Sequence, residues 1–99
     1  MSIGTKRDKV KQSFDVYAKC VCNYFEVDSN VFLHSNRKQC VDARYIVVYK
    51  LCEAYHDDEI ANTIGISIKV VNKIRNKFSE RLSDKVFKND YGYIVSSLL

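Results

Sequence analysis

The chain has no proline and only three glycines among its 99 residues. These two residue types interrupt helices most strongly, so little in the sequence would break long helical segments. Long apolar runs are also missing, because no window approaches the roughly 20 apolar residues that a membrane-spanning helix requires. We therefore expect a mostly helical chain with no membrane span.

Four cysteines are present, but their spacing matches no metal site. Cys20 and Cys22 are two residues apart, which on a helix points them about 200° apart. Cys40 and Cys52 stand alone within apolar patterns, the chain has no C-x-x-C pair, and neither histidine has ligand spacing to a cysteine. Buried reduced thiols are therefore expected rather than zinc ligands or disulfides, and no metal or cofactor is expected.

The net charge indicates the kind of partner. The formal charge is +4, and the excess lies in two segments. Residues 36–50 hold four basic residues and one acid, and residues 67–81 hold five basic residues and one acid. Such clustering favours an anionic partner such as nucleic acid. Residues 2–9 are polar with no apolar run behind them, so no secretory signal is expected and the predicted location is cytoplasmic.

Apolar residues recur at helical spacing along most of the chain. The periodicity predicts helices over residues 8–25 and 40–55, the second apolar nearly all round and therefore central to the core. A short helical turn is expected at residues 31–33 and a polar loop at 34–39. Residues 1–7 are expected to be a disordered basic start, and residues 8–99 one helical domain.

The C-terminal part of the chain contains residues typical of a turn. Asn89, Asp90 and Gly92 predict a turn, and residues 94–99 predict a terminal helical turn. Tyr91 and Tyr93 either cover the core or stack against a partner, and we expect the core.

The most informative segment is about residues 58–82, which has the pattern of a helix-turn-helix. Ile60 and Ile64 share one helix face, and Gly65 can adopt the positive φ of an abrupt reversal. Ser67 can cap a second helix by accepting a backbone N–H bond. The apolar positions of that second helix pack inward, leaving outward a face at i, i+3, i+4 and i+7 that consists of Lys69, Asn72, Lys73 and Asn76. Cations and amides without an acid suit a groove of duplex DNA, although a solvated helical hairpin has the same pattern.

Four stretches follow one another in a set order at residues 21–28, 33–38, 41–49 and 59–65 (VCNYFEVD, LHSNRK, VDARYIVVY and EIANTIG). In this order they resemble the C-terminal DNA-binding domain of the bacterial replication initiator DnaA, a Trp-repressor-like helix-turn-helix fold. The resemblance implies that Arg37 or Lys38 reaches the minor groove and that Arg44 contacts DNA. The signature with which that family reads its origin box, G-x-R-D-H-[ST]-T-V, is absent, because residues 65–71 read GISIKVV. The resemblance therefore implies the architecture without the box specificity, and the lack of a P-loop excludes ATP-dependent initiator activity for this chain.

These observations predict an all-α helical bundle that contains a helix-turn-helix and binds double-stranded DNA, without enzymatic activity. The expected role is a small transcriptional regulator or replication accessory protein of a bacterium or mobile element. The alternative is a helical protein-interaction module that does not bind DNA. The oligomeric state is left open. The predicted DNA-binding residues are Arg37, Lys38, Arg44, Ser67, Lys69, Asn72, Lys73, Arg75 and Asn76.

Overall fold

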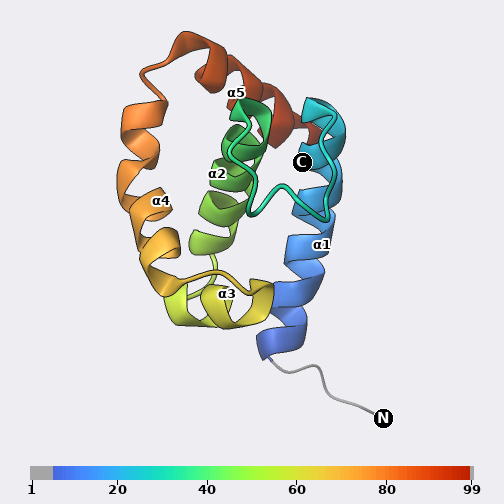
Figure 1. The fold of residues 1–99 in the computed structure, drawn as a ribbon, viewed down its shortest axis with the longest axis vertical. Coiled ribbons are helices and arrows are strands. Elements are labelled where there is room, and N and C mark those ends of the chain that lie inside the picture. Colours follow the sequence, from blue (N-terminus) through green and yellow to red (C-terminus); the bar gives the residue numbers. More distant parts are fainter. Residues whose placement is uncertain (1–5, 99) are drawn as a thin grey trace.

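The structure is a computed structural model that describes residues 6–98 (Figure 1). Within these residues it contains helices and no strand, as the sequence predicts. Most of the predicted basic start, residues 1–5, lies outside the described residues, and the first helix begins two residues before the predicted start of the domain. The five helices are α1 (Lys6–Phe25), α2 (Lys38–Cys52), α3 (Asp57–Ile64), α4 (Ile68–Arg81) and α5 (Lys85–Leu98).

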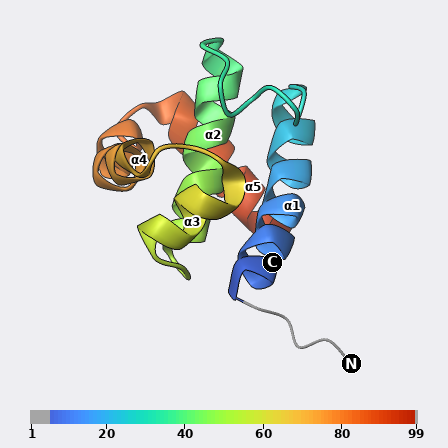
Figure 2. The same ribbon diagram turned by 60° about the horizontal axis from the view of Figure 1, so that its bottom comes forward.

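The helix α2 lies at the centre of the bundle. It packs against α1 on one side and α4 on the other, while α3 crosses below them and contacts α1, α2 and α4 (Figures 1 and 2). The helix α5 crosses the opposite end and packs on α1. Eight of the fifteen residues of α2 are buried, which explains why its sequence is apolar nearly all round.

The segment between α1 and α2 forms a hydrogen-bonded helical turn, as predicted. The backbone N–H groups of Val31 and Phe32 donate to the carbonyl of Asp28, both at 3.1 Å. Phe32 is fully buried and stacks on Phe14 of α1, with the ring centroids 6.2 Å apart. This aromatic contact fixes one side of the segment to the core.

The predicted turn at residues 89–92 is wrong, because α5 continues through it to Leu98. Asn and Gly lower helix propensity by no more than about 1 kcal/mol each, which tertiary packing can override. Phe87, Tyr91 and Ile94 follow one another at helical spacing and face the core. The ring of Tyr91 packs edge-on against Phe78, with the centroids 4.9 Å apart.

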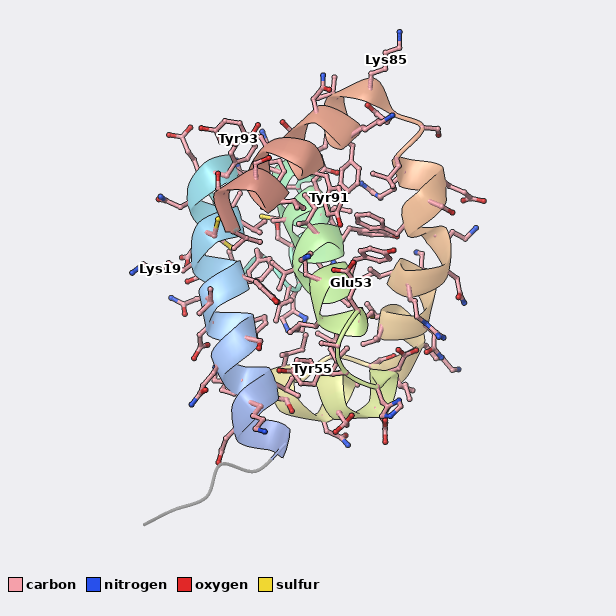
Figure 3. All side chains as sticks on the ribbon, turned by 180° about the vertical axis from the view of Figure 1, so that it is seen from behind. Lys19, Glu53, Tyr55, Lys85, Tyr91 and Tyr93 are labelled. Carbon is pink, nitrogen blue, oxygen red and sulfur yellow. The ribbon has the colours of Figure 1, made fainter. Side chains whose placement is uncertain are left out.

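The two neighbouring tyrosines of α5 have different surroundings. Tyr91 covers the edge of the core, as predicted, whereas Tyr93 is 63% exposed and leans on the ring of Tyr24. Figure 3 shows Tyr91 between α5 and α2, and Tyr93 beside the end of α1. Tyr24 itself is 38% exposed. The hydroxyl of Tyr24 donates to the carboxylate of Asp90 at 2.6 Å.

A buried carboxylate connects the end of α4 to the start of α2. Asp42 is 3% exposed and accepts from Lys38 at 2.9 Å and from Arg81 at 2.5 Å. The guanidinium of Arg81 also lies over the ring of Tyr45, 4.0 Å from its centroid. A buried acid requires such partners, because an unpaired buried charge is strongly destabilising.

Candidate nucleic-acid interface

Three residues connect α3 to α4, and each end of this connection is stabilised by a local feature. Gly65 has a φ of 75°, and its N–H donates to the carbonyl of Ala61 at 3.0 Å, which ends α3. The hydroxyl of Ser67 accepts from the N–H groups of Lys69 (3.0 Å) and Val70 (3.4 Å), which begins α4. The turn predicted at Gly65 and the cap predicted at Ser67 are therefore both present.

The two helices bury the faces expected from their sequences. From α3, Ile60 is fully buried and Ala61 nearly so. From α4, Val71, Ile74 and Phe78 are at most 1% exposed. These contacts set the rotation of α4 about its own axis, and so decide which residues it presents to solvent.

The outward face of α4 carries the four predicted residues. Lys69, Lys73 and Asn76 are exposed, and Asn72 is half-buried. In the part of the chain that the structure describes, neither of the two lysines is paired with a carboxylate. The nearest acid along this face is Glu80, one turn beyond Asn76 and within 3.8 Å of Lys77. The first three turns of α4 therefore present uncompensated positive charge beside amide groups.

A groove of about 430 Å³ runs beside this face. One wall is the loop that leads into α2, with Leu33, His34 and Asn36. The other wall is the connection and first turns of α4, and α2 contributes residues between the two walls. The lining residues outside the loop are Arg44, Tyr45, Gly65, Ile66, Ser67, Val70, Lys73 and Ile74.

The groove thus gathers three of the predicted DNA-binding residues, Arg44, Ser67 and Lys73. It also brings in Asn36 and Val70, which are not among the predicted residues. Asn36 precedes the predicted basic residues of the loop, and this adjacency was the available signal. Val70 carried no such signal, because an apolar residue at a helix start is usually part of the core.

Arg44 is engaged within the protein. Its Nη1 donates to the carbonyl oxygens of Phe32 (3.2 Å), Leu33 (2.8 Å) and Ser35 (3.2 Å). This arginine therefore joins α2 to the loop that forms one wall of the groove.

Two other predicted residues lie away from the groove and have partners. Lys38 pairs with Asp42 and lines a different hollow beside Arg81. Arg75 pairs with Asp57 of α3 at 3.0 Å, with its side chain still half exposed. Arg37 is exposed. Among the described residues only its backbone makes a contact, in which its N–H donates to the hydroxyl of Ser35 at 3.2 Å.

The cysteines are free thiols in partly or fully buried positions. Burial raises the pKa of Cys22 to about 11, and burial followed by the nearby charge of Asp57 raises the pKa of Cys52 to about 11. Thiols with a raised pKa are poor nucleophiles and poor metal ligands near neutral pH. Among the described residues, no group of three or more His, Cys, Asp or Glu side chains is placed to hold a metal ion.

No protein-family model matches this chain, and no curated protein or solved structure matches it either. None of the helices in residues 6–98 is both long enough and apolar enough to cross a membrane.

Proposed function

We propose that the chain binds double-stranded DNA through α3 and α4, which would act as a helix-turn-helix with α4 in the major groove. The observation that carries this proposal is the outward face of α4, where two lysines with no carboxylate partner among residues 6–98 alternate with two asparagines. An α-helix fits the width of the major groove, and the residues of its first turns are the ones that reach base edges in helix-turn-helix proteins.

The side chains of this face match the chemistry of base edges. Asn72 and Asn76 carry amides, which pair bidentately with adenine, and Lys69 and Lys73 can donate to guanine. The exposed apolar residues at the start of α4, Ile68 and Val70, suit the methyl group of thymine. Arg37 is exposed at the end of the neighbouring loop and would contact a phosphate.

The resemblance to the DnaA C-terminal domain agrees with this use of the fold and with a bacterial or mobile-element origin. On this proposal the protein is a small transcriptional regulator or replication accessory factor that does not read the DnaA origin box. The Asp-His-Thr trio with which that family reads its box is missing from residues 65–71.

A second candidate function is binding to another protein, and the same exposed apolar residues support it. Ile68 is 45% exposed and Val70 is 36% exposed, and Val70 lines the groove together with Lys73. Apolar residues framed by cations would also suit an amphipathic acidic segment of a partner protein.

Salt dependence of binding to a labelled random-sequence duplex separates these candidates. If about five phosphates are neutralised, log K should fall against log salt with a slope of about −4 to −5. Lys69→Ala should weaken binding and reduce the magnitude of the slope by about 0.9, because one contact is lost.

The matched control is Lys85→Ala, which removes an equal charge from the start of α5, at the end of the molecule opposite α3 (Figure 3). It should leave both affinity and slope nearly unchanged. No binding of wild type to any duplex at low salt would refute the DNA proposal and favour the protein partner. Equal effects of the two lysine variants would place the contact surface elsewhere.

A further inference from the structure

The hydrogen bonds of Arg44 satisfy backbone carbonyl groups in the loop before α2. The backbone N–H groups of His34 and Ser35 donate to the carbonyl of Val31, both at 3.1 Å, so residues 31–35 end a helical turn. Carbonyl groups at such an end have no partner within the turn. Nη1 of Arg44 donates to three of them, at residues 32, 33 and 35. A cation is also the favourable charge at the carbonyl end of a helical segment.

These bonds place the loop relative to the groove. Phe32 holds the loop to α1 through its buried ring and Leu33 packs, partly buried, against the core, but the polar residues after them reach the groove without an apolar anchor. Arg44 supplies that second attachment from α2. Ser35 then accepts the N–H of Arg37, whose backbone is extended (φ −63°, ψ 142°) as the residue before α2. The position of Arg37 therefore depends on a segment that Arg44 holds.

We propose that Arg44 is a positioning residue for DNA binding, which orders the loop so that Arg37 contacts a phosphate, and does not contact DNA itself. The inference rests on the proposed DNA-binding function. Nη1 carries two hydrogens, and three carbonyl oxygens share them, so this nitrogen has no donor left for a phosphate. Nε and Nη2 keep three further N–H donors, so a double-mutant cycle is needed to separate positioning from direct contact. This role differs from the direct contact that the DnaA resemblance implies for the arginine at this position.

A double-mutant cycle on duplex affinity tests the assignment. In about 0.1 M salt, loss of one phosphate contact lowers affinity about eightfold and reduces the magnitude of the salt slope by about 0.9, and this is the expectation for Arg37→Ala. Arg44→Met should lower affinity by no more than this amount. The double variant should match Arg37→Ala alone, because the loop has nothing left to position.

If Arg44 were itself a phosphate contact, the two losses would multiply. The double variant would then bind roughly 60-fold more weakly than wild type, with a slope reduced by about 1.8. That result would overturn the inference while leaving the proposed function intact. Failure of wild type to bind any duplex would instead refute the proposed function, and the inference with it.

Hydrogen exchange in the absence of DNA gives a readout independent of affinity. The amides of His34 and Ser35 should exchange about tenfold faster or more in Arg44→Met, since charge-assisted bonds to the loop are lost. Unchanged exchange would overturn the inference. Arg44→Lys serves as a second variant if Arg44→Met does not fold. It keeps the charge but loses the planar guanidinium, so exchange should again be faster, whereas a phosphate contact would survive this substitution with a nearly unchanged salt slope.

Discussion

Gly92→Ala should stabilise the protein, although the local sequence around this glycine is typical of a turn. Gly92 is the eighth of fourteen residues in α5, and a β-carbon built on it would meet no atom within 4 Å. Alanine in a helix interior is favoured over glycine by about 0.5–1 kcal/mol, because glycine loses more backbone entropy on folding. For a domain of this size, that gain corresponds to a rise of about 2–8 °C in Tm.

Gly65→Ala is the matched comparison, since it introduces the same methyl group with the opposite expected sign. A β-carbon at Gly65 would also find open space, but the φ of 75° lies in the left-handed region. That region costs a non-glycine residue about 1–2 kcal/mol, offset in part by the reduced entropy of the unfolded chain. The expected net loss is about 1 kcal/mol, with Tm lower by about 4–8 °C.

Thermal unfolding followed by circular dichroism at 222 nm measures both variants under one set of conditions. The double variant should lie close to wild type, because the two sites are on different helices and their effects should add. A fall in Tm for Gly92→Ala similar to that for Gly65→Ala would refute the reasoning. It would show that residue 92 also requires a positive φ and that α5 is broken there.

Three further predictions concern a buried ion pair, a thiol and base recognition. Arg81→Met should lower the free energy of unfolding in urea by about 3–5 kcal/mol, because it leaves Asp42 buried without its closest partner. Lys38→Met should lower it by no more than about 1 kcal/mol, since Lys38 is mostly exposed, and equal losses would contradict this difference. Burial raises the pKa of Cys22 from 9.0 to about 11, so the unfolded state loses its proton first and the free energy of unfolding should fall between these pH values. Cys22→Ala should fall less steeply in the same titration, and parallel curves would exclude the thiol as the cause. In a selection of bound duplexes from a random pool, wild type should not enrich the DnaA box, and Asn72→Ala should alter the enriched motif. Enrichment of the box by wild type, or a motif that Asn72→Ala leaves unchanged, would show that other residues read the bases.

Local signals were sufficient to predict much of α3 and α4. The positive φ of Gly65 and the helix cap at Ser67 depend on residues within four positions along the chain, so both can be predicted from the local sequence. The inward facing of Ile74 and the outward facing of Lys69 follow from a period of 3.6 residues. The central place of α2 followed from apolar residues around its whole circumference.

Sequence alone did not determine α5 or the partners of the basic residues, because both depend on contacts between distant segments. The aromatic residues of α5 pack on Phe78, and this packing outweighs the turn propensity of residues 89–92. Arg81 meets an acid 39 residues away, and Arg44 meets carbonyl groups 9 to 12 residues away. In the sequence these arginines are simply positive charges, and nothing there distinguishes them from the lysines. Only the tertiary structure separates the arginines that bond within the protein from Lys69 and Lys73, which have no carboxylate partner in the described part of the chain. The reason is that an ion pair requires proximity in space and not along the chain.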